Sequence, residues 1–474
     1  MRGRRTGRPA SAGGVRTAAV LLLTAVLGTP AGQAVAAETS RLAIREDEVV
    51  LFLGDELVDA PDSRISTNFP YLVELFLTAR YPDLKARYLH SGWTGDTAGR
   101  ALLRLDRDVL SRQPTLVVVC LGLNDPGYLP YSHERLVRYR RDLKALAERL
   151  NRAGARVWLI SPPTVGGESG KAVRVYRDGA IGVADLEAIR YNETLARYSA
   201  AAREVAAETG SGFVDWTALS GEHVGAAPGT FGRDGRLPGP RSHTAIAAAL
   251  LRALGAEPIQ VAVEFDWNEG LATISSPSEP SRRVVAEVLE DGQRILVLEG
   301  LPLAWPMPGG RATWIQADPQ AASLCQLLFR VTNPPTRGIT LKQDTPEGGP
   351  SPQITLRRAE IQEGFSLAAS DALRTAREAQ ELLTYVGWKN FYAYSTWRRQ
   401  ELEPRKEPEL AAAQAQLIAA MWSMVQGHER IIQRLPRTFS VRLVLREALP
   451  PERLPTAPPF GPRPRFSPSS RPGE

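Results

Sequence analysis

The residue with the most evident chemical potential follows an apolar stretch near the start of the chain. Val49 to Glu56 (VVLFLGDE) combines β-branched and large apolar residues and closes with Gly-Asp-Glu. A continuous apolar run of this length is typical of a buried strand in a parallel sheet, where both faces are covered. Ligands of such sheets bind at the carboxyl ends of the strands. We therefore expect the Glu56 carboxylate to point into a site.

Two later segments also lead from an apolar run into polar residues. His90 to Thr97 (HSGWTGDT) is Gly-rich and predicts a strand-to-helix loop that caps the next helix, with backbone amides able to face a bound anion. Thr115 to Leu121 (TLVVVCL) predicts a second buried strand, and Gly122-Leu123-Asn124-Asp125 follows it. The Asn124 amide could donate a hydrogen bond into the same cleft.

The elements around these segments alternate in type. Apolar residues at helical spacing predict helices over 70–81, 132–153, 186–209 and 244–254, and short apolar runs predict strands over 157–160 and 213–215. Alternating strands and helices are typical of a three-layer α/β domain with a parallel sheet. We expect this domain to cover residues 45–256.

These motifs, in this order, resemble the SGNH or GDSL hydrolase family of flavodoxin-like esterases, lipases and carbohydrate deacetylases. The similarity lies in four blocks: Gly54-Asp55-Glu56, Gly92-x-x-Gly95-Asp96-Thr97, Gly122-x-Asn124-Asp125, and Asp234-Gly235-Arg236-Leu237-Pro238 followed by Ser242-His243. The resemblance implies a flavodoxin-like fold. It also implies an acyl-transfer site with a serine nucleophile, a histidine base, an aspartate and an oxyanion hole.

Carried over residue by residue, the resemblance makes Gly95 and Asn124 the oxyanion donors and Asp234 the triad acid. The nucleophile position, however, holds Glu56, and the histidine position holds Leu237. Loss of a nucleophile or its base removes about 10⁶ of a triad's turnover, or roughly 8 kcal/mol of barrier. Glu56 also places negative charge where an oxyanion develops. We therefore expect a degenerate triad with absent or very weak ester hydrolysis.

Three rearrangements could restore a reaction. His243 could serve as a substitute base, and Ser63 or Ser66 could replace the nucleophile. Glu56 and Asp234 could form a carboxylate pair for hydrolysis of a glycosidic bond, which needs one carboxyl group with a raised pKa beside one with an ordinary pKa.

The retained residues also have purely structural interpretations. Gly95 and Gly122 could be required for backbone conformation alone. Asn124 could brace the neighbouring loops, and Asp234-Gly235 is a common turn pair.

The first 37 residues have the features of a signal peptide. Five arginines precede an apolar run from Ala18 to Leu27, and Ala34-Val35-Ala36 offers a cleavage site. We expect export, to the medium, the periplasm or the cell envelope, with no transmembrane segment after cleavage; a membrane anchor is the alternative. Removal of this segment lowers the formal net charge from +6 to +1, so the charge gives no support for nucleic-acid binding.

The second half of the chain changes pattern. Alternating runs predict a small antiparallel β domain over 257–363 with a hairpin at Asp291-Gly292. Helices over 370–400 and 408–434 form a helical region from 364 to 435, a last strand is predicted at 439–445, and the Pro-rich tail 449–474 should be disordered. The whole order resembles exported SGNH-type proteins of planctomycete-like bacteria.

Aromatic residues crowd the first of these helices: Tyr385, Trp388, Phe391, Tyr392, Tyr394 and Trp397. Such rings could stack on a sugar or pack a helix interface. Neither CxxC pairs nor His-rich spacings occur, so we expect no metal and no cofactor.

Three functions stay open. The chain could be a catalytically degenerate protein that binds or scaffolds a carbohydrate or envelope ligand. It could be an esterase that acts on acyl esters or acetylated sugars through a rearranged site. Alternatively, the α/β domain could support β and helical modules that make the functional contacts. The sequence leaves the oligomeric state undetermined.

Overall fold

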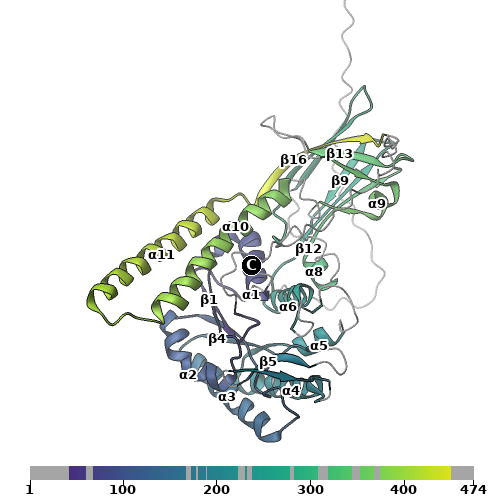
Figure 1. The fold of residues 1–474 in the computed structure, drawn as a ribbon. Coiled ribbons are helices and arrows are strands. Elements are labelled where there is room, and N and C mark those ends of the chain that lie inside the picture. The colour runs from purple at the N-terminus through teal and green to yellow at the C-terminus, as the bar shows by residue number, and fades with distance from the viewer. Residues whose placement is uncertain are drawn as a thin grey trace, which may run out of the picture.

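The computed structural model describes residues 42–59, 68–166, 172–177, 180–187, 189–222, 230–231, 237–277, 282–307, 319–343, 353–367 and 374–449. The predicted signal segment, Ser63, Ser66, Asp234 and residues 450–474 lie outside these ranges. The described residues form an α/β domain, a β module and a helical hairpin, which are seen at the bottom, top and left of Figure 1.

Five parallel strands make up the central sheet of the α/β domain. Their order is β2 (Arg87–Gly92), β1 (Val49–Gly54), β3 (Leu116–Cys120), β4 (Arg156–Ile160) and β7 (Gly212–Val214). This is the flavodoxin-like order, in which the direction of strand addition reverses between β1 and β3. The three-layer α/β fold predicted from the sequence is therefore confirmed.

Helices cover both faces of this sheet, as the side chains of β1 show. Val50 and Phe52 lie in one hydrophobic core, and Leu51 and Leu53 lie in another. The first core is covered by α1 (Phe69–Arg80), α5 (Trp216–Glu222) and α6 (Pro240–Ala253), and the second by α2 (Ala98–Asp108), α3 (His133–Arg152) and α4 (Tyr191–Thr209) (Figure 1). Two 3₁₀ turns, Pro82–Leu84 and Leu110–Arg112, follow α1 and α2.

One hairpin of the α/β domain was not predicted. Strands β5 (Val173–Arg177) and β6 (Ala180–Ala184) pair antiparallel between β4 and α4. They form a sheet of their own and leave the parallel sheet unchanged.

The β module consists of two sheets. One has the order β10 (Arg283–Val288), β11 (Arg294–Pro302), β16 (Thr438–Glu447), β13 (Ile339–Gln343) and β14 (Gln353–Leu356). The other has the order β15 (Phe365–Ser366), β12 (Cys325–Thr332), β8 (Ile259–Asp266) and β9 (Leu271–Ser275), and short helices α8 (Pro319–Leu324) and α9 (Arg358–Glu363) lie between its strands in sequence. The predicted hairpin joins β10 to β11, with Gly292 at φ +79°.

Two features of the module differ from the prediction. Strands β8 and β12 run parallel, because the chain crosses to the other sheet and back before β12. The last strand, β16, lies between β11 and β13, so residues well beyond 363 complete the module.

The helical hairpin consists of α10 (Arg374–Ser395), a π-helical turn (Thr396–Glu401) and α11 (Pro408–Arg434). The π-helical turn interrupts the helix that was predicted to run continuously over 370–400. Within the described ranges, no helix has both the length and the apolar composition that a bilayer crossing requires.

The three parts share one hydrophobic core. The Tyr71 hydroxyl of α1 donates to the Leu383 carbonyl of α10 at 2.9 Å, and the Trp305 indole of the β module donates to the Leu72 carbonyl at 3.0 Å. Trp305 also packs edge-on against Phe76. Helix α1 is thus buried by all three parts of the chain.

Candidate functional site

The candidate site lies where the carboxyl ends of β1, β2 and β3 meet. Strand β1 ends at Gly54, where a Cβ atom would lie 2.5 Å from the Cys120 carbonyl oxygen, so this position requires glycine. The Asp55 carboxylate accepts the Leu57 N–H at 3.0 Å and stabilises the turn that follows. This turn presents Glu56 to the loops after β2 and β3.

Glu56 accepts hydrogen bonds from both predicted oxyanion donors. Its Oε2 atom lies 3.0 Å from the Gly95 backbone nitrogen and 2.8 Å from the Asn124 Nδ2 atom. Gly95 has φ +76°, a conformation that glycine adopts at no steric cost. The Tyr128 hydroxyl donates to Asn124 Oδ1 at 2.9 Å, which orients the amide. The loop from Gly92 to Thr97, which carries the second motif block, is called the second-block loop. The anion that faces this loop is therefore the protein's own Glu56 carboxylate.

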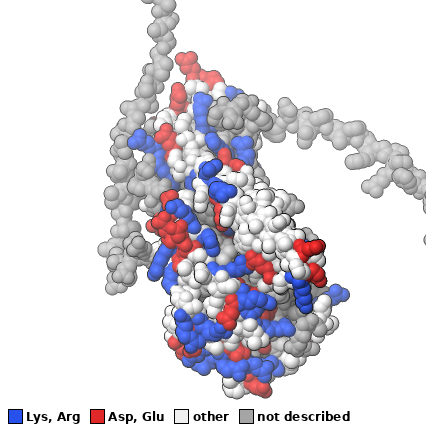
Figure 2. Space-filling model, turned by 90° about the vertical axis from the view of Figure 1, so that its left-hand side faces the viewer, with Lys and Arg blue, Asp and Glu red and all other residues white. Residues whose placement is uncertain are grey.

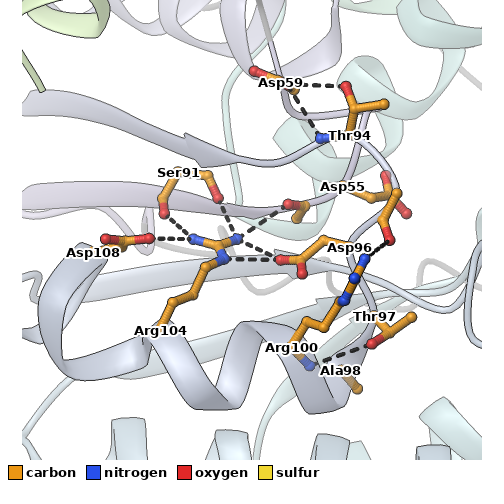
Figure 3. Close-up of polar contacts among 12 residues, drawn as sticks. Asp55, Asp59, Ser91, Thr94, Asp96, Thr97, Ala98, Arg100, Arg104 and Asp108 are labelled. Carbon is orange, nitrogen blue, oxygen red and sulfur yellow. Dashed lines mark hydrogen bonds and ion pairs between the residues drawn. The ribbon is translucent and has the colours of Figure 1, made fainter. Parts of the chain in front are cut away.

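A buried arginine holds this second-block loop in place (Figure 3). The Arg104 guanidinium donates to Asp96 Oδ2 at 2.9 and 2.7 Å, to the Ser91 hydroxyl at 2.6 Å and to Asp108 at 3.3 Å. The Thr97 hydroxyl caps α2, as the sequence predicted for this loop. Arg104 was not identified from the sequence, because it lies within an ordinary amphipathic helix.

The helical hairpin also reaches this loop. The Asp59 carboxylate accepts the Thr94 N–H at 3.2 Å and the Tyr394 hydroxyl at 3.0 Å. The Arg398 guanidinium stacks on the Trp93 ring, with its Cζ atom 3.0 Å from the ring centroid. The π-helical turn therefore brings a residue of the hairpin against the loop that carries Gly95.

Part of this chain matches the model of a known protein family. Residues 52–262 match the model of the GDSL-like Lipase/Acylhydrolase family. The match supports the resemblance inferred from the four blocks, and we refer to this part of the chain as the GDSL-like domain.

A curated relative matches the same part of the chain. Acetylxylan esterase from Geobacillus stearothermophilus is 26% identical over 230 residues, which are 45% of this chain and 97% of the relative. A crystal structure of Axe2, an acetylxylan esterase from the same organism, aligns at 25% identity with a TM-score of 0.36, over 45% of this chain and 96% of that chain.

A second solved structure is similar over more of the chain. A gut microbial diltiazem-metabolizing enzyme aligns with a TM-score of 0.62 and 18% identity, over 85% of this chain and 98% of that chain. At this identity the likeness concerns the fold. It extends beyond the GDSL-like domain, because that domain alone accounts for less than half of the chain.

Carboxylates in the GDSL-like domain crowd the site and alter one another's protonation. Burial, followed by the charge of Glu56, raises the pKa of Asp55 well above its usual range. Burial raises the pKa of Asp125 to about 7, although its hydrogen bond from the Ala98 N–H acts in the opposite direction. Burial also raises the pKa of Asp96 despite the Arg104 guanidinium beside it. The site thus disfavours additional negative charge.

His243, the predicted substitute base, lies in the hydrophobic core. Its Nδ1 atom accepts the Phe69 N–H at 3.2 Å, and its ring stacks on Phe69 and meets Trp216 edge-on. Burial lowers the pKa of His243 to about 3. Its imidazole is therefore neutral at physiological pH, and Nδ1 is already engaged as an acceptor.

The remaining predicted residues divide into two groups. Leu237, at the histidine position, is partly buried and packs against the hydrophobic core. Asp234 and the alternative nucleophiles Ser63 and Ser66 lie outside the described residues. Within the described ranges, no cluster of three or more His, Cys, Asp or Glu side chains has an arrangement that could hold a metal ion.

Proposed function

We propose that the GDSL-like domain is a non-hydrolytic binding or scaffolding domain. The observation that carries this proposal is the position of Glu56. Its Oε2 atom accepts from the Gly95 N–H and from Asn124 Nδ2, the two groups that would stabilise an oxyanion. The place of the anion that these donors would otherwise stabilise during ester hydrolysis is taken by the Glu56 side chain.

The proton-transfer side of the site supports the same proposal. A triad needs a base within hydrogen-bond reach of its nucleophile. The histidine position holds Leu237, and the nearby His243 uses its Nδ1 atom to accept the Phe69 N–H. The two hydrogen bonds to Oε2 also make the Glu56 carboxylate a weaker nucleophile, because the donors stabilise its negative charge.

For the ligand we propose a carbohydrate or another component of the cell envelope. Support comes from the curated relative, which is named an acetylxylan esterase. Export, inferred from residues 1–37, is part of the same proposal. N-terminal sequencing of protein recovered from the periplasm or medium of a bacterial host tests it, and an intact Met1 there contradicts signal cleavage.

A second candidate function is an esterase with a rearranged site. It is favoured by the oxyanion donors themselves, since Gly95 and Asn124 still converge on one atom and Tyr128 still orients the amide. Movement of the Glu56 side chain would make both donors available to a substrate carbonyl.

Hydrolysis assays separate the two functions. Purified protein is tested on short-chain acyl esters and acetylated xylooligosaccharides beside Asn124→Ala, Glu56→Gln and the double variant Glu56→Ser, Leu237→His. We expect no turnover from the unaltered protein or from Glu56→Gln, and measurable turnover from the double variant. Adding Asn124→Ala to the double variant should then lower kcat by about 10²–10³.

The same assays can also contradict the non-hydrolytic proposal. Turnover by the unaltered protein that Asn124→Ala abolishes would show that the donors act in catalysis, and the non-hydrolytic proposal would be wrong. Binding of non-hydrolysable xylooligosaccharides, measured by calorimetry, tests the ligand class separately from the chemistry.

A further inference from the structure

Helix α11 has two apolar faces, and the described chain covers only one of them. Val425 and Ile432 are buried, and His428 between them contacts the Tyr385 and Tyr392 rings of α10. Leu410, Leu417, Met424 and Ile431 are 54, 46, 45 and 39% exposed. These four residues recur every seventh position, so they form a continuous stripe roughly 32 Å long.

Small residues lie beside this stripe at the complementary heptad positions. Ala413, Ala420 and Gly427 each follow a large apolar residue by three positions. Nothing lies within 4 Å of the place where a Cβ atom on Gly427 would stand. A glycine in the middle of a helix costs about 1 kcal/mol relative to alanine. This glycine leaves an open surface to which another helix can approach closely.

We infer that α11 is a dimerisation helix that packs antiparallel against α11 of a second copy of this chain. The large residues of the stripe occupy the first position of each heptad, and the small residues occupy the fourth. In an antiparallel pair, the first position of one helix faces the fourth position of its partner. Leu410 then faces Gly427 of the other copy, Met424 faces Ala413, and Leu417 faces Ala420. Leu410, Leu417 and Met424 each meet a small residue, whereas a parallel pair would place each of them against its own copy and the small residues against one another, which leaves space unfilled.

The charges along the stripe fit the same register. Glu409 and Arg430 are both exposed and border the stripe near opposite ends of α11. In the antiparallel pair, Glu409 of each copy lies near Arg430 of the other, because both occupy the seventh heptad position. One helix thus supplies both halves of the charge pair, which favours a second copy over an unrelated partner.

The position of α11 in the molecule leaves room for this contact. The helix packs along α10 in the hairpin at the left of Figure 1, and its Trp422 ring lies 5.8 Å from the Arg112 guanidinium of the GDSL-like domain. Figure 2 views that side and shows a broad area without charged side chains, bordered by charged ones, at the height of α11. Among the described residues, the exposed side of α11 is therefore available for a contact with a second copy.

Light scattering coupled to size-exclusion chromatography tests the dimer with the purified protein. We expect twice the mass of one chain. Gly427→Leu should give a single-chain mass because the new side chain meets Leu410 of the partner, even though leucine improves helix propensity. Ala419→Leu, an exposed position of α11 outside the stripe, is the matched control and should stay dimeric.

Charge reversal tests the register. Glu409→Arg should raise the dissociation constant of the dimer several-fold, and adding Arg430→Glu should restore it. A single-chain mass for the unaltered protein at about 100 μM overturns the inference, and so does a Gly427→Leu variant that remains a dimer. A chain shortened after residue 449 that dimerises when the full chain does not would show that the tail covers the stripe, which also overturns it.

Discussion

Two buried carboxylates of the GDSL-like domain have contrasting surroundings. Glu74 of α1 pairs with the Lys389 ammonium of α10, and it accepts from Asn390 Nδ2 at 2.6 Å. Burial alone would raise the pKa of Glu74, but Lys389 and His90 outweigh burial and hold it below its usual range. For Asp55 at the candidate site, burial and the charge of Glu56 act together and raise the pKa.

The difference separates a structural contact from a site. The charges around Glu74 join the helical hairpin to the GDSL-like domain, and each carboxylate oxygen has a donor from α10. At the candidate site, three carboxyl groups have raised pKa values, and Arg104 pairs with only one of these three, Asp96. Buried carboxyl groups that lack a cation for each of them are typical of functional sites, whereas paired carboxylates are typical of contacts that stabilise the fold.

Breaking the balanced pair should have the largest effect. Lys389→Met leaves the Glu74 carboxylate buried without its ammonium partner, which should lower the free energy of unfolding by about 3–5 kcal/mol at pH 7. Urea denaturation measures this loss. Lys85→Met removes the exposed Lys85–Glu46 pair and is the matched control, with an expected change below about 1 kcal/mol.

The pH dependence of that loss sharpens the comparison. The lowered pKa of Glu74 gives stability that is present above the unfolded pKa of about 4.5 and is lost as the pH falls through the folded pKa. Lys389→Met should therefore cost less at pH 4 than at pH 7, and Glu74→Gln should restore most of the loss at pH 7. An equal loss at both pH values contradicts a charge-based role for the pair.

The unbalanced site should respond to pH in the opposite sense. Asp125 has a folded pKa of about 7, above its unfolded value of 3.8, so its contribution to stability is present at low pH and is lost as the pH rises toward 7. From pH 5 to 8 the protein should lose on the order of 2–3 kcal/mol through this group. Asp125→Asn should flatten that slope, whereas the exposed Asp106→Asn should leave it unchanged.

The smallest effect concerns the contact that joins the hairpin to the site. Arg398→Ala removes the guanidinium from the Trp93 ring and should lower the free energy of unfolding by about 1 kcal/mol. The change should also alter the fluorescence of Trp93. Arg405→Ala, exposed between the π-helical turn and α11, is the control. Equal effects of the two variants would show that the stack contributes nothing specific.

The sequence predicted which residues would meet at the site, because parallel strands end at one edge of a sheet. Glu56, Gly95 and Asn124 follow three such strands, and the structure joins them by hydrogen bonds. The sequence did not predict that the Glu56 side chain would occupy the donors itself. That outcome depends on side-chain rotamers and on the turn after Gly54, which strand patterns do not determine.

Contacts between segments that are distant in the chain could not be predicted from the sequence either. Tyr394 meets Asp59 across 335 positions of the chain, and Arg104 donates to the Gly54 carbonyl across 50 positions. Both depend on the packing of whole elements. Amphipathic periodicity identifies α2 and α10 as helices without indicating which polar side chains they bring together. The predicted aromatic cluster likewise divides between His428 of α11 and Trp93 of the site loop.

The place of β16 between β11 and β13 has a consequence for the order in which the molecule is assembled. The chain from residue 303 to residue 437, including the whole hairpin, is made before the strand that closes the five-stranded sheet. Until then β11 and β13 each have an unpaired edge, which is open to association with other chains. A nascent or truncated chain that ends before Thr438 therefore has all of its GDSL-like domain but an incomplete β module.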